Sequence, residues 1–171
     1  QFDQKITILD RKDVEGENFL DGAKKKDIAL LVYGSPLTAT THISLLLTCK
    51  KGKILYSVLH NASIFDLVAE TGLQLYKFGK TASMPSWNKE YKPISFVEII
   101  KENQSIGAHT LLLVDIGLSF KESVFQLKQA CKESKIFLSK IVVCSCLGLK
   151  NQKIICMAFE TLEKLKQEIV E

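Results

Sequence analysis

Two short loops hold the residues whose types and spacing could do chemistry in this chain. The first covers residues 34–39 (GSPLTA), and the second begins with residues 60–63 (HNAS). Each loop follows an apolar run and precedes a helical pattern, so each is expected at the carboxyl end of a strand. At such junctions, free backbone N–H groups and the helix dipole favour a polar or anionic ligand. The sequence therefore predicts a ligand site built from these two loops.

The strands that would hold the loops are predicted from hydrophobic runs. Residues 27–33 and 54–59 are mostly apolar, as is typical of strands covered by helices on both faces of a sheet. Residues 6–9 form a shorter apolar run of the same kind. We therefore expect three strands in the first part of the chain.

The helix after the first loop is predicted to begin near two threonines. Gly34 and Pro36 end the preceding strand, and Thr40 and Thr41 are suitable caps for a helix. Three apolar residues then recur at helical spacing, so we expect them to form the apolar side of this helix. They are Ile43, Leu46 and Leu47.

The rest of the chain alternates between helical and strand patterns, which indicates the α/β class. The expected helices are residues 14–25 and 64–70, a helix with Phe96, Ile99 and Ile100 that ends at Gly107, one with Val124, Leu127 and Cys131, and a final one with Leu162, Leu165 and Ile169. The expected strands are residues 81–85, 109–116, 141–146 and 153–156.

Four segments, taken in order, resemble the diphthine synthases, which are S-adenosylmethionine-dependent methyltransferases of the tetrapyrrole methylase fold. The family patterns GDPxxATTH, HNASI, GLQxYKFGxT and GxHTLxLLDI correspond to residues 34–42, 60–64, 72–81 and 107–116. Gly148 and the NQKI at residues 151–154 resemble the family's RVGxxDQKI.

The resemblance implies two α/β domains with the cofactor cleft between them. We expect a partial N-terminal domain at residues 1–72 and a C-terminal domain at 73–171, with a hinge near residues 72–81. The family's first strand and glycine-rich turn would precede the chain, and its closing hairpin would follow it.

Three departures from the family pattern fall near the predicted site. Ser35 stands where the family usually has Asp, and Cys146 stands where it often has Arg. The connection after Asp115 is short and lacks the expected Pro-Arg-Tyr stretch. A serine can still form hydrogen bonds but carries no charge, so weaker cofactor binding is an expected consequence.

The cofactor implied by the resemblance is S-adenosyl-L-methionine, which would leave as S-adenosyl-L-homocysteine. Its expected contacts, mostly through the backbone, are Ser35, Thr38, Ser63, Ile64, Val114 and Leu147. The methyl acceptor would be the amine or carboxylate of a modified histidine on translation elongation factor 2. No catalytic residue and no metal site are assigned, and Asp66 and Asp115 are the nearest carboxylates that could accept a proton. A cytoplasmic homodimer without direct nucleic-acid or membrane binding is expected.

Two other functions remain open at this point. A non-catalytic remnant of the fold could act as a binding module, which the serine at position 35 would favour. Another methyltransferase of the same fold could act on a small molecule, but the segments HNASI and YKFG argue against it.

The amino-acid composition limits the class of protein and its cellular setting. The 171 residues are 46% hydrophobic with a net charge of +4, as expected of a globular chain, and no apolar run reaches the length of a membrane span. The odd number of cysteines, five in all, indicates reduced thiols in a cytosolic setting.

Cys144 and Cys146 share a strand face, but no partner pair at ligand spacing supports a zinc site. The three histidines are expected to make structural hydrogen bonds.

Two lysine clusters and one loop with aromatic residues each allow more than one interpretation. Residues 24–26 and 50–53 contain three lysines each, and a solvated surface is favoured over contact with an acidic patch or ribosomal RNA. Trp87 and Tyr91 lie in a polar connection, where they could contact a partner or fold back onto the sheet.

Overall fold

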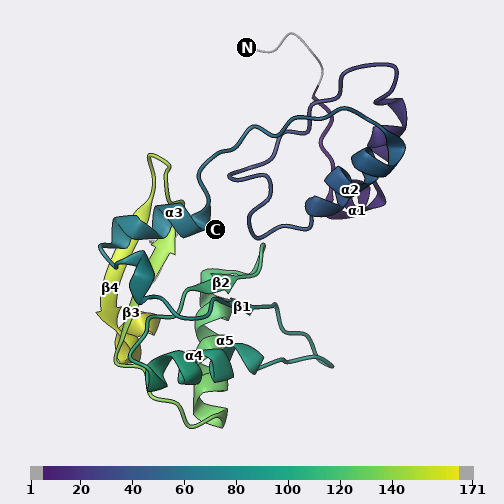
Figure 1. Cartoon of the computed structure of the whole chain (residues 1–171). Helices are drawn as coiled ribbons and strands as arrows, with labels where there is room; N and C mark the ends of the chain where they lie inside the picture. The colour runs from purple at the N-terminus through teal and green to yellow at the C-terminus, as the bar shows by residue number, and fades with distance from the viewer. Residues whose placement is uncertain (1–5, 166–171) are drawn as a thin grey trace. The chain divides into compact units, whose positions relative to one another are not determined.

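The computed structural model describes residues 6–165. The chain divides into two compact units, Gln1–Ile64 and Phe65–Glu171, which are labelled by their elements in Figure 1. The domain boundary expected at residue 72 stays a prediction. No helix among the described residues is long and apolar enough to cross a membrane.

The first unit holds two short helices near its start instead of the single helix expected at residues 14–25. Helix α1 covers Arg11–Gly16, and the 3-10 helix η1 covers Asn18–Gly22. A capping box starts α1 early, because the Asp10 carboxylate accepts a bond from the Asp13 backbone N–H at 2.8 Å. Glu17 then interrupts the helical backbone with a φ of 59°. The prediction of one continuous helix is therefore wrong.

The strands expected at residues 6–9, 27–33 and 54–59 are also wrong, because no described residue of the first unit belongs to a β ladder. A strand requires hydrogen bonds to a neighbouring strand, and an apolar run alone does not supply that partner. The side chains expected to be buried are exposed instead, with Leu55 at 99% and Leu59 at 87%. These segments are connections without ladder hydrogen bonds.

Helix α2, Ile43–Gly52, follows the first loop as predicted, but its cap and buried side differ from the prediction. His42 occupies the N-cap, while the Thr40 hydroxyl accepts a bond from the His42 backbone N–H at 3.2 Å. The buried residues are Leu45 and Cys49, one turn apart, rather than the expected face. Both Ile43 and Leu47 are more than half exposed.

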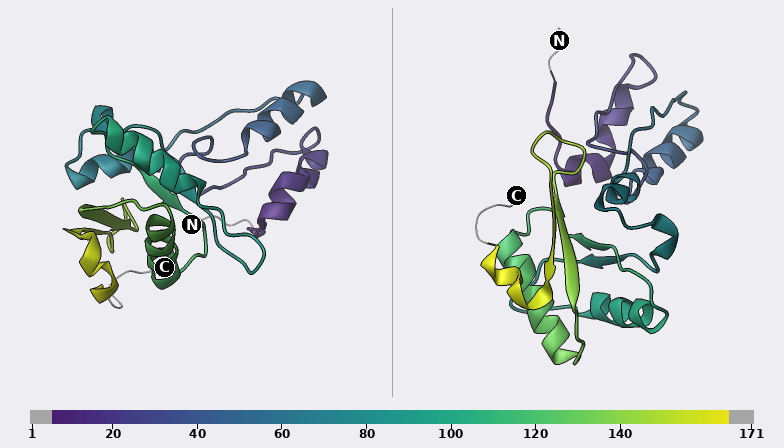
Figure 2. Two further views of the ribbon diagram at one scale, coloured as in Figure 1. Left: turned by 90° about the horizontal axis from the view of Figure 1, so that it is seen from below. Right: turned by 90° about the vertical axis from the view of Figure 1, so that its left-hand side faces the viewer.

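The second unit contains all the strands of the described chain. In order, its elements are α3 (Ile64–Leu67, at the unit boundary), η2 (Val68–Thr71), η3 (Leu75–Lys77), β1 (Ala82–Met84), α4 (Ser95–Ser105), β2 (Leu112–Val114), α5 (Phe120–Glu133), β3 (Lys140–Ser145), β4 (Lys153–Ala158) and η4 (Phe159–Lys164). Strands β1 and β2 pair in parallel across the α4 crossover. Strands β3 and β4 form an antiparallel hairpin, with α5 alongside it in Figure 2.

Most sequence predictions for this unit are confirmed. The strand at 81–85, the helices after residues 95 and 119, and the final strand pair are all present. The strand expected at 109–116 is shorter, because only Leu112–Val114 pairs with β1 and Ile116 is fully exposed. The last predicted helix begins as η4, and its Ile169 lies outside the described residues.

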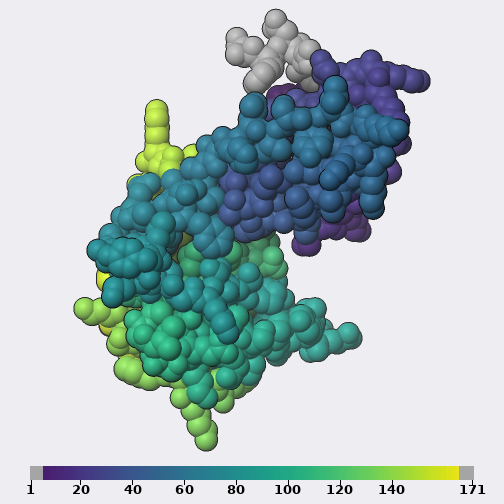
Figure 3. Space-filling view, in the orientation of Figure 1, coloured from purple at the N-terminus to yellow at the C-terminus, as the bar shows by residue number. Residues whose placement is uncertain are grey.

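The core of the second unit lies where α4 and α5 pack against the strands. Its fully buried side chains include Met84, Phe96, Val97 and Leu162, and the hairpin adds Val143 at its edge. Helix α5 buries the three residues predicted from its spacing, Val124, Leu127 and Cys131. The β3–β4 turn, by contrast, projects from the surface of this unit, as seen in Figure 3.

A buried asparagine ties the end of α4 to the chain entering β1. Asn103 is 2% exposed, and its Oδ1 accepts a bond from the Lys80 backbone N–H at 2.9 Å. Its Nδ2 donates to the Lys80 carbonyl and to the Thr110 hydroxyl, both at 2.8 Å. A methyl group on Gly79 would lie 2.1 Å from Asn103 Oδ1, so only glycine fits beside this amide.

We predict that Gly79→Ala destabilises the chain by about 3 kcal/mol, because the new methyl group must displace Asn103 from its hydrogen bonds. The free energy of unfolding, measured by urea titration, checks this value. In the background of Asn103→Ala the same substitution should cost much less, because the amide with which it collides is gone.

Gly107→Ala is the matched control in the same unit. Gly107 has a φ of +67° but no atom within 4 Å of an added methyl group, so only backbone strain of about 1 kcal/mol is expected. Equal losses for the two variants would show that Asn103 is not the cause.

Candidate functional site

The first loop is held by its own side chains. Ser35 Oγ and Thr38 Oγ1 lie 2.9 Å apart and share a hydrogen bond. The Pro36 carbonyl oxygen lies 2.8 Å from His42 Nδ1, which confirms the structural hydrogen bond expected of that histidine. Two residues of the loop, Gly34 and Ala39, have left-handed φ values of 78° and 55°. The loop therefore has a defined shape before any ligand binds.

The backbone N–H groups of this loop remain available to a ligand. Within the described residues, no backbone N–H from Ser35 to Ala39 donates a hydrogen bond to the protein. Free amides in a partly buried loop need water or a ligand as their partner. The loop thus fits a polar group held by backbone contacts, which is the kind of contact predicted for Ser35 and Thr38.

The second loop lies beside the first within the same unit. A methyl group built on Gly34 would lie 3.6 Å from the Ala62 carbonyl oxygen, so the two loops approach each other closely here. The Asn61 side chain accepts a bond from the Ala62 backbone N–H at 2.8 Å, and Ser63 is buried. Ile64, the fourth predicted contact in this unit, begins α3 and is half-buried.

The two predicted contacts in the second unit lie on different elements. Val114 ends β2 and is 45% exposed, whereas Leu147 is buried in the β3–β4 turn. Strands β2 and β3 belong to separate sheets. The role of all six residues as cofactor contacts stays a prediction.

The β3–β4 turn is tied to the helical segment at the start of the second unit. Gly148 N–H donates to Gln152 Oε1 at 2.8 Å, and Gln152 Nε2 donates to Glu70 Oε2 at 2.7 Å. A methyl group on Gly148 would lie 3.2 Å from a Leu67 methyl carbon. Cys146 has a left-handed φ of 51°, which is unusual for a residue other than glycine. The turn is therefore a constrained structure next to Leu147.

The Asp115 carboxylate and the His109 ring each have a structural partner. Asp115 Oδ2 accepts a bond from the Ser86 N–H at 3.2 Å, and Oδ1 accepts one from the Ile116 N–H at 3.1 Å. These bonds give Asp115 a role in shaping the loop after β2. His109 packs edge-on against the Phe78 ring, with centroids 5.4 Å apart. Among the described residues, no group of three or more His, Cys, Asp or Glu could hold a metal ion.

Two buried amide side chains were missed by the sequence analysis. One is Asn103, and the other is Gln126, whose amide accepts from the Trp87 N–H at 2.9 Å and donates to the Pro85 carbonyl at 3.0 Å. Each lies on the apolar side of its helix. A polar residue at such a position indicates a buried hydrogen-bonding role, and this pattern could have been found in the sequence. Trp87 folds back against the core, and its indole N–H donates to the Pro93 carbonyl.

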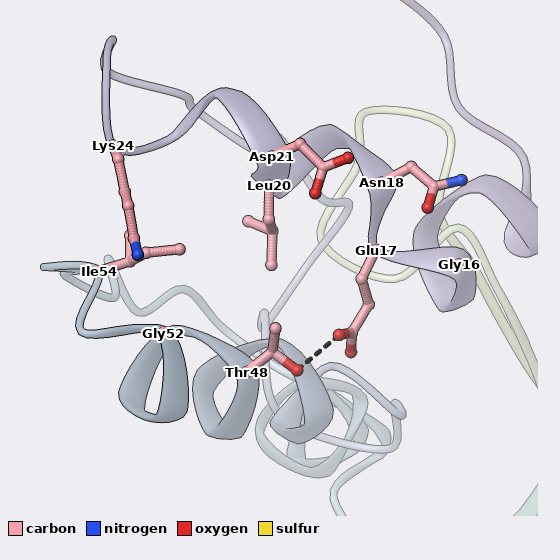
Figure 4. Close-up of a pocket in the computed structure, with 9 residues that line it drawn as sticks. All are labelled: Gly16, Glu17, Asn18, Leu20, Asp21, Lys24, Thr48, Gly52 and Ile54. Carbon is pink, nitrogen blue, oxygen red and sulfur yellow. Dashed lines mark hydrogen bonds between the residues drawn. The ribbon is translucent and has the colours of Figure 1, made fainter.

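The first unit also has an open hollow of about 440 Å³, drawn in Figure 4. The residues that line it are Gly16, Glu17, Asn18, Leu20, Asp21, Lys24, Thr48, Gly52 and Ile54. None of the six predicted cofactor contacts is among them. The Thr48 hydroxyl donates to Glu17 Oε2 at 2.5 Å, which connects α2 to the η1 segment.

The comparisons with known proteins agree with the family resemblance of the four sequence segments. The diphthine methyl ester synthase of Bos taurus is 46% identical to this chain over 117 residues, which are 67% of this chain and 41% of that protein. The diphthine synthase of Methanocaldococcus jannaschii is 44% identical over 124 residues, 71% of this chain and 48% of that protein. The chain is a homologue of the diphthine synthases. It spans less than half the length of these two relatives.

The likeness to diphthine synthases extends to solved structures. A crystal structure of diphthine synthase matches with a TM-score of 0.78 and 32% identity, covering 92% of this chain and 62% of that one. No family model matches the chain. The predicted fold, α/β of the tetrapyrrole methylase type, is confirmed by this structural match, and the suspected diphthine synthase resemblance is confirmed by the sequence identity.

The five cysteines of this diphthine synthase homologue are free thiols with different environments. Burial raises the pKa of Cys131 to about 11 and also raises the pKa of Cys144. Cys156, on the same hairpin as Cys144, is exposed. A raised pKa lowers the thiolate fraction at a given pH, and the thiolate is the reactive form.

We predict that iodoacetamide near pH 8 modifies Cys156 first and Cys131 last, by a margin of at least about tenfold in rate. Peptide mass spectrometry at successive times measures the order. Cys156→Ser should remove the fastest phase and leave the Cys131 rate unchanged. If Cys131 reacted as fast as Cys156 in the folded chain, its burial would be contradicted.

Proposed function

We propose that this chain is an S-adenosylmethionine-dependent methyltransferase of diphthamide biosynthesis, which methylates the modified histidine of translation elongation factor 2. The single observation that carries the proposal is the 46% identity with a diphthine methyl ester synthase over two thirds of the chain. The resemblance of residues 34–42, 60–64, 72–81 and 107–116 to the family pattern adds support, because these segments contain both candidate loops.

The cofactor would be held by backbone groups more than by side chains. The four first-unit contacts are Ser35, Thr38, Ser63 and Ile64, and the loops that carry them approach each other beside Gly34. Val114 and Leu147 complete the proposed set. The free N–H groups of Ser35 and of residues 37–39 fit the carboxylate or hydroxyl oxygens of such a cofactor, because those oxygens accept hydrogen bonds.

Methyl transfer from this cofactor would require little acid–base catalysis by the protein. The bound cofactor supplies a methyl group on a positively charged sulfur, which is already a strong electrophile. The loops would orient the donor and exclude water, so that the acceptor attacks in line. Such a role agrees with a proposed site that consists mainly of hydroxyl groups and backbone amides. The Asp115 carboxylate already accepts hydrogen bonds from two backbone N–H groups.

The location and assembly follow from the same proposal. The protein would act in the cytoplasm, where its free thiols stay reduced, and would form a homodimer. Elongation factor 2 would be its protein partner, and S-adenosyl-L-homocysteine would be its second product.

A binding module without turnover is the second candidate. It is favoured by Ser35, which carries no charge where the family usually has Asp, and whose hydroxyl is already bonded to Thr38. In that case the chain would bind elongation factor 2 or a partner subunit through the same fold.

The proposal predicts methyl transfer to elongation factor 2 that already carries the diphthamide precursor. The chain is incubated with S-adenosylmethionine and this substrate, and intact mass spectrometry should show a mass increase of whole methyl groups. Unmodified elongation factor 2 is the matched control and should gain no mass. Cofactor binding without transfer to either form would favour the binding module.

A second prediction concerns the first loop. Gly34→Val should weaken binding of S-adenosylmethionine at least about tenfold, because a β-branched residue is strained at a φ of +78°. Ser35→Ala should change the dissociation constant less than about threefold, since its proposed contacts use the backbone. Isothermal titration calorimetry measures both, and circular dichroism checks the fold. A larger loss for Ser35→Ala would place the important contact on its hydroxyl.

A further inference from the structure

Two segments of the first unit, residues 27–33 and 54–59, have the side-chain pattern of strands but form no β ladder with a described residue. From Asp27 to Tyr33 the side chains alternate strictly between exposed and half-buried. Residues 54–59 follow the same alternation except at Tyr56, which is 51% exposed. A period of two is typical of an extended backbone, because its successive side chains point to opposite sides. We call these two stretches the open segments.

One side of each open segment faces a helix of its own unit. A methyl group built on Gly22, the last residue of η1, would lie 3.8 Å from Ile28 Cδ1. Ile54 lines the hollow together with Gly52, the last residue of α2. The unit therefore supplies packing for this side of the open segments.

The opposite side is apolar and exposed. Leu31 and Tyr33 are 62% and 81% exposed, and Leu55 and Leu59 are 99% and 87% exposed. Burial of such side chains is the main favourable contribution to most protein association. This side of the open segments is therefore suited to a partner with apolar side chains.

The backbone of the open segments carries unused hydrogen-bonding groups. Within residues 6–165, no backbone N–H or C=O of residues 27–33 or 55–59 forms a hydrogen bond with another described group. Figure 1 accordingly draws both stretches as traces without arrows. A row of unpaired N–H and C=O groups on an extended backbone is a template for a further strand.

These backbone groups select the class of partner. A helix satisfies its own backbone internally, and a lipid has no regular array of donors and acceptors. Either one could cover the leucines but would leave the backbone groups of the open segments without protein partners. An extended polypeptide offers both features, since it has apolar side chains at alternate positions and N–H and C=O groups at the strand repeat.

We propose that the open segments bind an extended apolar strand of another polypeptide by strand addition. Backbone hydrogen bonds hold the added strand, and its side chains pack as cross-strand neighbours of Leu55 and Leu59 or of Leu31 and Tyr33. The open segments lead directly into the two candidate loops, which begin at Gly34 and His60, so the added strand also restricts these loops. The proposal does not depend on methyl transfer, because strand binding is measured without the cofactor.

The first test uses the unmodified full chain and two peptides. The probe is a fluorescein-labelled peptide of about ten residues that alternates Val and Thr, which favours an extended backbone. The control peptide has the same side chains and an N-methyl group on every amide nitrogen, so it has no backbone donors. Fluorescence anisotropy should show that the control binds at least about tenfold more weakly than the probe. Equal binding of the two peptides would overturn the proposal, because apolar contact alone would then explain it.

The second test locates the binding site with two double variants. One combines Leu55→Ser with Leu59→Ser, and the matched control combines Phe125→Ser with Phe137→Ser, two side chains of the second unit that are 63% and 71% exposed. We expect the first variant to bind the probe at least about tenfold more weakly than the unmodified chain, and the control to lose less than about threefold. Equal losses would contradict a site at the open segments. The peptide comparison uses the unmodified chain, so it decides the question even where a variant fails to fold.

A second copy of this chain is the competing occupant. Light scattering measures the mass of the unmodified chain and of the Leu55→Ser, Leu59→Ser variant, each with and without the probe. A dimer that this variant converts to a monomer, with no probe bound by either form, would overturn the proposal, because the open segments would then pair between copies. A dissociation constant weaker than about 1 mM for the probe would also overturn it.

Discussion

The second unit depends on the amide of Asn103, because this one side chain satisfies three polar groups where α4, the chain entering β1 and the chain entering β2 meet. It binds both backbone groups of Lys80 and the hydroxyl of Thr110. Next to it, the backbone N–H of Gly79 donates to the His109 carbonyl at 2.9 Å, so the two chains that enter the parallel strands are already paired there. A buried amide with every partner present specifies one arrangement, and leaving any of those partners unsatisfied is costly. The close approach of Asn103 then requires glycine at position 79.

This constraint changes how the YKFG segment is interpreted. A segment that identifies a family is easily taken as a set of ligand contacts, yet here the glycine is explained by the space that Asn103 needs. The neighbouring Tyr76 is exposed, and Phe78 packs edge-on against His109. The first loop differs, because no described residue accepts a hydrogen bond from its backbone N–H groups. The two parts of the family pattern therefore have separate physical causes, packing in one and open hydrogen-bonding capacity in the other.

Sequence reasoning succeeded where a residue pattern is decided locally. The spacing of Val124, Leu127 and Cys131 fixes the buried side of α5, and the alternation of turn and apolar residues predicts the β3–β4 hairpin. It failed for residues 27–33 and 54–59, because a strand also needs a hydrogen-bonded neighbour that no local pattern can guarantee. The approach of the first loop to Ala62 was expected only from the order of the two junctions. Asn103 and Gln126 were missed since their partners lie far away in the sequence.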